Sequence, residues 1–186
     1  MKYVYILWII LGLSGCDQFA PVSPYKISNY ERMADKITAQ TVRKIEAETG
    51  LRLCGMGGGM MNHVRSMSLS FDYLGEMNME QGRELMVYCV NEYLSAINNH
   101  LEIRPYLIQY PFTPKNVQIR IFIRKANGQE VSSGSLTVVC AIEGSLKYKI
   151  KQADFQITHR ESFEEAVSIL EKGGSIQKIR KNTYHL

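Results

Sequence analysis

The stretch "VQIRIFIRKANGQEVSSGSLTVVCAIEGSLKYKI" (117–150) decides the fold, because it holds three apolar segments separated by turn residues. Residues 117–124 alternate between apolar and polar side chains except at Phe122, which is the pattern of a half-buried β-strand. The dipeptide Asn127-Gly128 is typical of a tight hairpin turn. Two further β-rich segments follow at 136–142 and 146–150. Together these segments predict three consecutive antiparallel strands.

The register of the predicted strands follows from matching their apolar positions. A two-residue turn in the first connection places Ile119 opposite Leu136. A three-residue loop at 143–145 places Cys140 opposite Tyr148. Cys140 is therefore predicted to lie on the buried face of the sheet, as a small core residue.

The rest of the chain adds helices and one more strand. Apolar residues recur at helical spacing over about 28–50, 78–100 and 162–173, and each segment begins with a serine or asparagine that can cap a helix. "RSMSLSF" (65–71) alternates like a strand, and the three prolines of "RPYLIQYPFTPKN" (104–116) predict an extended connection. This order predicts an α+β fold of two layers, an antiparallel β-meander sheet with helices packed on one face.

The N-terminal stretch "MKYVYILWIILGLSGC" (1–16) has one early lysine, an apolar run and then small residues. This is the order of an export signal, and the apolar run is short for a membrane span. Residues 13–16, Leu-Ser-Gly-Cys, resemble the lipobox of bacterial lipoproteins. The resemblance implies that residues 1–15 are a cleaved signal peptide and that Cys16 is diacylated on its sulfur. Several acyl chains would give durable membrane anchoring.

Two prolines without periodicity in residues 17–27 indicate a tether before the domain, and the resemblance indicates where the chain is located. Residues 16–27 are expected to be the lipidated cysteine and a tether, and residues 28–186 a single α+β domain. Asp17, directly after the cysteine, resembles the inner-membrane retention signal of lipoproteins from enteric-type bacteria. The expected location is the periplasmic face of the cell envelope, with the inner membrane favoured.

Composition narrows the classes of function. Removal of residues 1–15, which hold one lysine and no acid, changes the formal net charge from +4 to +3. This mild balance lacks the clustered excess of basic residues that nucleic-acid binding needs. None of the four histidines has a spacing typical of a catalytic triad, a metal pair or a nucleophile elbow. The sequence therefore predicts a non-catalytic interaction or structural module, with no cofactor.

A glycine-rich segment, "CGMGGGMMNH" (54–63), is the main candidate for an alternative function. It carries five soft or borderline donors, which together would select Cu(I): Cys54, Met56, Met60, Met61 and His63. The alternative function is thus that of a Cu(I)-binding envelope protein. The glycines are also compatible with a phosphate cradle, or with a simple bend between a helix and a strand.

Basic residues occupy the outward positions of the predicted sheet. They are Arg120, Arg124, Lys147, Lys149 and Lys151. On a domain held near a membrane, such a face is expected to dock on an anionic envelope surface or on an envelope protein. The alternative is a solvated face whose lysines protect the sheet edges from pairing.

Three cysteines remain besides Cys16. The odd number of Cys54, Cys89 and Cys140 allows either one disulfide and one thiol or three thiols in an oxidising compartment. Cys89 falls on the predicted buried stripe of its helix, so it is expected to be a core thiol. A disulfide between Cys89 and Cys140 remains open if that helix packs over that strand.

Overall fold

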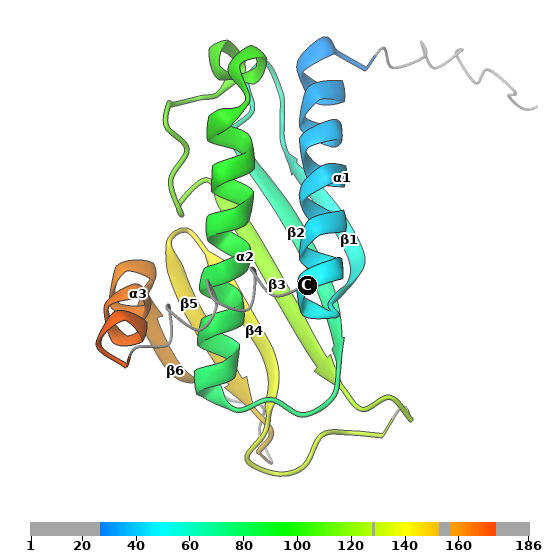
Figure 1. Cartoon of the computed structure of the whole chain (residues 1–186), viewed down its shortest axis with the longest axis vertical. Helices are drawn as coiled ribbons and strands as arrows, with labels where there is room; N and C mark the ends of the chain where they lie inside the picture. Colours follow the sequence, from blue (N-terminus) through cyan, green and yellow to red (C-terminus); the bar gives the residue numbers. More distant parts are fainter. Residues whose placement is uncertain (1–26, 128, 153–156, 174–186) are drawn as a thin grey trace, which may run out of the picture.

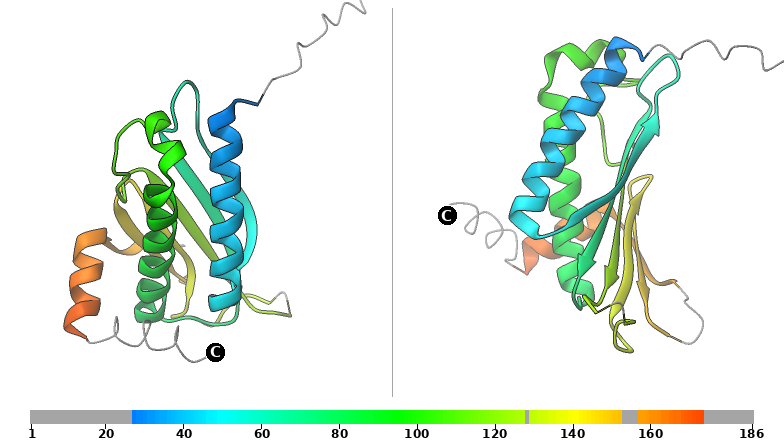
Figure 2. Two further views of the ribbon diagram at one scale, coloured as in Figure 1. Left: turned by 45° about the horizontal axis from the view of Figure 1, so that its top comes forward. Right: turned by 90° about the vertical axis from the view of Figure 1, so that its right-hand side faces the viewer.

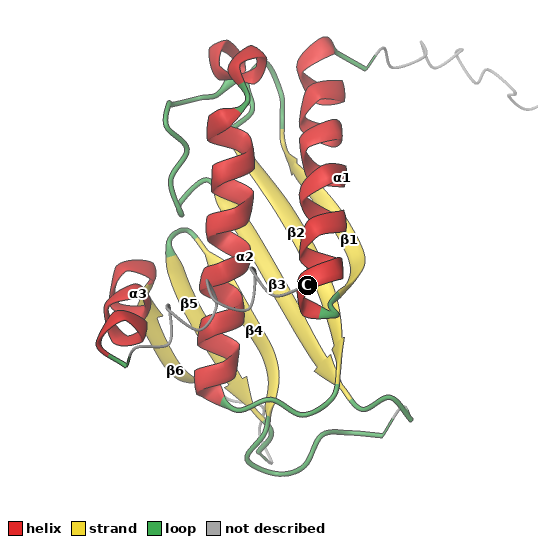
Figure 3. Cartoon of the chain, viewed as in Figure 1, coloured by secondary structure: helices red, strands yellow, loops and turns green. Residues whose placement is uncertain are grey.

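The computed structural model describes residues 27–127, 129–152 and 157–173 of the 186-residue chain. A six-stranded sheet is covered on one face by helices (Figures 1, 2 and 3), which confirms the predicted α+β class. The elements in chain order are α1 (Asn29–Thr49), β1 (Arg52–Gly59), β2 (Ser66–Leu74), α2 (Met79–Asn99), the 3₁₀ helix η1 (Leu101–Tyr106), β3 (Val117–Arg124), β4 (Leu136–Ile142), β5 (Ser145–Ile150), β6 (Ile157–Ser162) and α3 (Phe163–Lys172).

The strands lie in the sheet in the order in which they occur in the chain, from β1 to β6. All neighbouring pairs are antiparallel except β2 and β3, which are parallel. Parallel neighbours need a long crossover connection, and α2 lies within it. The sheet is therefore mixed and larger than the antiparallel meander that the sequence predicted.

Residues 54–59 of the glycine-rich segment lie in strand β1 instead of forming the expected bend, and residues 60–63 belong to the loop after it. Glycines weaken a strand, so the pattern gave no strand signal there. A glycine is required at position 58, because a Cβ atom there would lie 2.4 Å from the carbonyl oxygen of Ser66 on β2. The two backbones thus approach too closely at this point for any other residue.

The predicted register between β3 and β4 is wrong. Residues 125–135 connect these strands, so Asn127 lies within a long loop and not in a two-residue turn. Ile119 pairs with Ala141, five positions from the predicted Leu136. Gly128 itself lies outside the described residues.

The predicted register between β4 and β5 is also wrong, by one residue. The turn consists of Glu143 and Gly144 alone, with φ angles of 53° and 74°. Cys140 consequently pairs with Lys147 and not with Tyr148. A one-residue slip moves a side chain to the other face. Cys140 therefore lies on the outer face of the sheet, and not on the core face as predicted.

The three predicted helices are confirmed, and each begins with a capping box. The side chains of Ser28, Asn78 and Ser162 accept a hydrogen bond from the backbone N–H three residues later, and the residue there returns one. The predicted extended connection at 104–116 instead begins inside η1, which includes Pro105. In so short a 3₁₀ segment, the proline removes only one donor.

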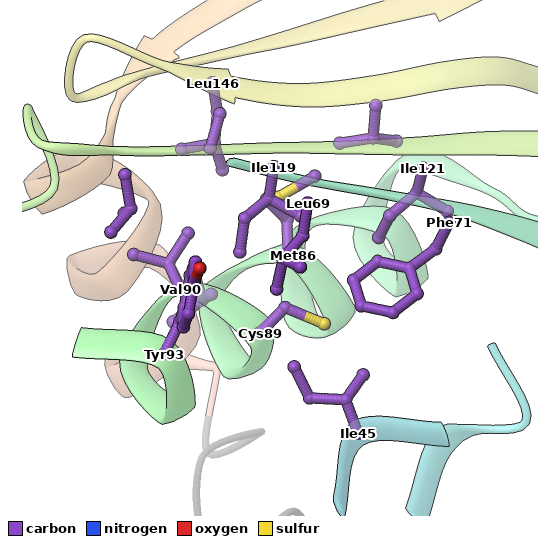
Figure 4. Close-up of a cluster of buried hydrophobic side chains, with 14 of the residues drawn as sticks. Ile45, Leu69, Phe71, Met86, Cys89, Val90, Tyr93, Ile119, Ile121 and Leu146 are labelled. Atoms are coloured by element: carbon purple, nitrogen blue, oxygen red, sulfur yellow. The ribbon is translucent and has the colours of Figure 1, made fainter. Parts of the chain in front are cut away.

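The core lies between the sheet and the helical layer (Figure 4), and α2 runs along the middle of that layer (Figure 1). Met86, Cys89 and Tyr93 of α2 are fully buried and meet strand residues such as Leu69 and Ile119. Cys89 is thus a core thiol, as predicted, and it is not in a disulfide.

The predicted signal peptide, Cys16 and the tether up to residue 26 lie outside the described residues. Within the described ranges, none of the helices combines the length and the apolar character that crossing a bilayer requires.

Candidate functional site

On the face of the sheet turned away from the helices, a line of cross-strand partners runs over four strands, and three of its four residues are basic. Arg120 of β3 pairs with Cys140 of β4, Cys140 with Lys147 of β5, and Lys147 with Arg160 of β6. Neighbouring strands are about 4.8 Å apart, so this line spans about 15 Å. We call Arg120, Lys147 and Arg160 the basic row. No helix of the described residues covers this face (Figure 2).

The basic row differs from the predicted set of partner-binding residues. Arg124 forms an ion pair with Asp72 at 3.2 Å, and Lys151, beyond the end of β5, forms one with Glu130 at 2.7 Å. Arg160 was not predicted, because β6 gave no recognisable strand pattern. Within the part of the chain that the structure describes, no acidic side chain forms an ion pair with Arg120, Lys147, Lys149 or Arg160.

The basic row places two like charges directly opposite each other on neighbouring strands. Lys147 and Arg160 are direct cross-strand partners, and like charges in this position destabilise a sheet. Cys140, between Arg120 and Lys147, is only 8 % exposed. Burial raises the pKa of its thiol, although the cations of Lys147 and Arg120 oppose the shift. The thiol is therefore protonated near neutral pH and does not offset the positive charge.

Apolar side chains share this face with the basic row. Phe122, Val138 and Ile142 occupy alternate positions of β3 and β4 relative to Arg120 and Cys140, and each is half-buried. The outer face thus combines apolar side chains on its central strands, β3 and β4, with the basic row that runs across the strands.

A pocket of about 660 Å³ lies between α1 and the glycine-rich strand β1 with the loop after it. Met56, Met60 and Met61 line it, with Asp35 of α1 also in its wall. The hydroxyl of Tyr30 on α1 donates a hydrogen bond to the carbonyl oxygen of Met60 at 2.9 Å and so ties the helix to the loop.

The structure brings together three of the five predicted Cu(I) donors. The three methionines line the pocket, whereas Cys54 and His63 do not. Cys54 is exposed at an irregularity of β1, and the charges that act on it are Asp72 and Arg124, toward the outer face. Among the described residues, no group of three or more His, Cys, Asp or Glu side chains is placed to hold a metal ion.

A buried ionic network joins α2 to the last two strands. Arg83 donates to both carboxylate oxygens of Glu161, at 2.7 and 3.1 Å, and the Tyr148 hydroxyl donates to the same carboxylate. His159 Nε2 lies 3.2 Å from Glu161 Oε2. Burial opposes ionisation of Glu161, but the hydrogen bonds from Arg83 and Tyr148 outweigh it, so the pKa of this carboxyl is lowered.

This network fits a structural role, because its charges are paired and its members hold separate elements together. Arg83 and Glu161 are only 8 % and 6 % exposed. They are 78 residues apart in the chain, so no local sequence pattern could have connected them.

No family model matches the chain, and comparisons with curated proteins and with solved structures likewise found no match.

Proposed function

We propose that the chain is a lipid-anchored protein of the bacterial cell envelope and that it acts as a non-catalytic docking module for an acidic protein. The lipobox-like residues 13–16 support the anchor through Cys16. The observation that carries the docking role is the pairing of Lys147 with Arg160. This contact costs stability in the free domain, whereas a carboxylate placed between the two cations would make the same arrangement favourable.

The apolar side chains of the outer face favour a protein partner over a simple anionic layer. Phosphate groups alone would offer Phe122, Val138 and Ile142 no apolar surface to pack against. A protein surface with carboxylates at its rim would cover them and pair with the basic row as well. Such electrostatic complementarity mainly sets the association rate and the choice of partner.

Site-directed photo-crosslinking in living cells tests the docking role. A benzophenone amino acid at Gln118, on the outer face, should give discrete adducts, whereas the same residue at Ile169 on α3 should not. Adducts from position 118 should disappear in the double variant Lys147→Glu, Arg160→Glu. The matched control Lys36→Glu, Arg43→Glu makes the same change of charge on exposed residues of α1 and should keep them. Unchanged adducts in the first double variant would refute the proposal.

Metabolic labelling with an alkyne-bearing fatty acid tests the anchor. The wild-type chain should incorporate the label and sediment with membranes, and Cys16→Ser should abolish both. A chain that carries no label on Cys16 would remove the lipid anchor from the proposal.

The pocket supports Cu(I) binding as a second candidate function, with a smaller ligand set than the sequence suggested. Met56, Met60 and Met61 are thioether donors lining one cavity, and thioethers select Cu(I). In competition titrations under reducing conditions, replacement of all three by leucine should abolish binding, whereas the variant Cys54→Ser, His63→Gln should retain it. The reverse result would exclude the pocket as the site.

A further inference from the structure

One end of the domain is unusually apolar. The described residues include nine large hydrophobic side chains that are exposed, and six of them come from four segments at this end. These six are Ile27, Met61, Leu101, Tyr106, Ile108 and Tyr110. We call this set the tether end, because it includes the first described residue. The start of α1, the β1–β2 loop and η1 lie together at the top of Figure 1.

Contacts between the segments make the tether end one continuous surface. The ring of Tyr30 on α1 stacks on Tyr106 of η1, with centroids 5.5 Å apart, and its hydroxyl bonds to Met60 in the β1–β2 loop. The backbone N–H of Ile108 donates to the carbonyl oxygen of Val64 in the same loop at 3.0 Å. The exposed side chains are thus held by packed elements, and not by isolated loops.

The composition of the tether end resembles that of surfaces at a membrane–water interface. Aliphatic side chains are combined with two tyrosines, whose apolar rings and polar hydroxyls suit the headgroup region. The guanidinium of Arg104 lies 4.6 Å from the ring centre of Tyr110 and keeps a cation at the same level. Glu102 lies in the same helix, η1, and its carboxylate limits the contact to a shallow depth.

The length of the chain before residue 27 places a bilayer near this end. If Cys16 carries the lipid, Ile27 lies eleven positions after it, with ten residues between the two. A coil of this length spans about 18 Å on average and at most about 40 Å when fully extended. The opposite end of α1 lies about 31 Å further away, since the helix has 21 residues.

We propose that the tether end rests on the bilayer surface, with α1 and α2 upright on the membrane and the outer sheet face turned sideways toward its partner. This inference builds on the proposed lipid anchor. The anchor holds the domain at a local concentration of the order of millimolar near the lipid, so that even a weak apolar contact is populated.

Depth-dependent fluorescence quenching tests this orientation in the acylated chain. Trp8 is the only tryptophan of the sequence and lies in the predicted signal peptide, so processing would remove it; Trp8→Phe keeps any unprocessed chain free of tryptophan as well. In this background, Leu101→Trp places a reporter at the tether end, and Ile169→Trp places the control on α3. Both side chains are exposed, by 69 % and 45 %, so both variants are expected to fold. The chains are reconstituted in vesicles of phosphatidylethanolamine and phosphatidylglycerol that contain lipids brominated near the headgroup.

The expected result is quenching of the tryptophan at position 101 several-fold stronger than at position 169, and its loss when Tyr106→Ser and Ile108→Ser are added. Equal or absent quenching at the two positions would overturn the inference, because the domain would then tumble freely on its tether. A blue shift at position 101 that depends on protein concentration without vesicles would overturn it too, since a second copy would then be the occupant.

The intact mass of the same samples reports the anchor separately. Acylated chains without preferential quenching would refute the orientation and leave the anchor standing. Unacylated chains that are still quenched at position 101 would refute the anchor and leave the membrane contact standing.

Discussion

Replacing Arg83 by methionine should destabilise the domain strongly, because it leaves the Glu161 carboxylate buried without its main partner. The carboxylate is 6 % exposed and receives two hydrogen bonds from Arg83, at 2.7 and 3.1 Å. Removing one partner of a buried ion pair costs about 3–5 kcal/mol. The Tyr148 hydroxyl still donates to the carboxylate, so we expect a loss near 3 kcal/mol. This is a large share of the roughly 5–15 kcal/mol that stabilises a typical domain.

A double-mutant cycle separates the ion pair from simple loss of packing. Glu161→Gln should cost a similar amount, since it leaves the Arg83 guanidinium uncompensated. The variant with both changes has no buried charge at this site and should be more stable than the sum of the two single losses predicts, by at least about 1.5 kcal/mol. Urea unfolding followed by circular dichroism measures all four proteins. Losses that add to within about 0.5 kcal/mol would refute the ion-pair explanation.

The surface provides a control, and pH provides a second test. Lys44 and Glu92 form an ion pair at 2.6 Å on exposed faces of α1 and α2, and Lys44→Met should cost less than about 1 kcal/mol.

The pKa of Glu161 is lower in the folded protein than in the unfolded chain, where it is about 4.3. Ionised Glu161 therefore stabilises the fold fully above this unfolded pKa, and that stabilisation is lost as the pH falls through the folded pKa. The wild type should therefore lose stability more steeply between about pH 5 and pH 3 than the double variant. Equal slopes would contradict this assignment.

Three further outcomes are expected. The double variant Lys147→Gln, Arg160→Gln should raise the free energy of unfolding by about 0.2–1 kcal/mol, because it relieves like-charge repulsion. The same variant should give fewer crosslinks to the proposed partner. A loss of stability would contradict the repulsion. Gly82→Ala should lower stability by about 1 kcal/mol in the same urea assay. A Cβ atom there would lie 2.6 Å from a side-chain atom of β4, and this overpacking should outweigh the gain in helix propensity. A more stable variant would show that the β4 side chain can move aside. Cys54 is exposed and should react with a maleimide in the native state. Cys89 is buried, and burial raises the pKa of its thiol, so it should react only on unfolding. Mass spectrometry of labelled peptides distinguishes the two cysteines.

Local signals in the sequence predicted the helices well. A capping box involves residues only three positions apart, so Ser28 and Ser162 mark their helices without any knowledge of the fold. The half-buried strands β2 and β3 were equally clear, because one of their faces is apolar and the other polar.

The strand register and the sites depended on information that local patterns do not contain. Both faces of β4 are apolar, since Val138, Cys140 and Ile142 face outward while Val139 and Ala141 face the core. Alternation therefore could not choose between registers. Because the β4–β5 register was wrong, Cys140 was placed in the core and not in the line of the basic row. Nothing in the predicted register pointed to Arg160 on β6 as a member of that row. The wall of the pocket combines a helix with a glycine-rich strand, and composition alone did not predict that strand.

The agreement between chain order and strand order in the sheet also bears on how the domain folds. Each new strand pairs with the strand that precedes it in the chain, so none has to wait for a distant segment. The β2–β3 pairing closes the longest connection between neighbouring strands, and α2, which can form locally, lies within it. Folding rates fall as contacts become more distant in sequence. A chain that emerges N-terminus first can therefore extend the sheet one strand at a time, from the β1 edge toward β6.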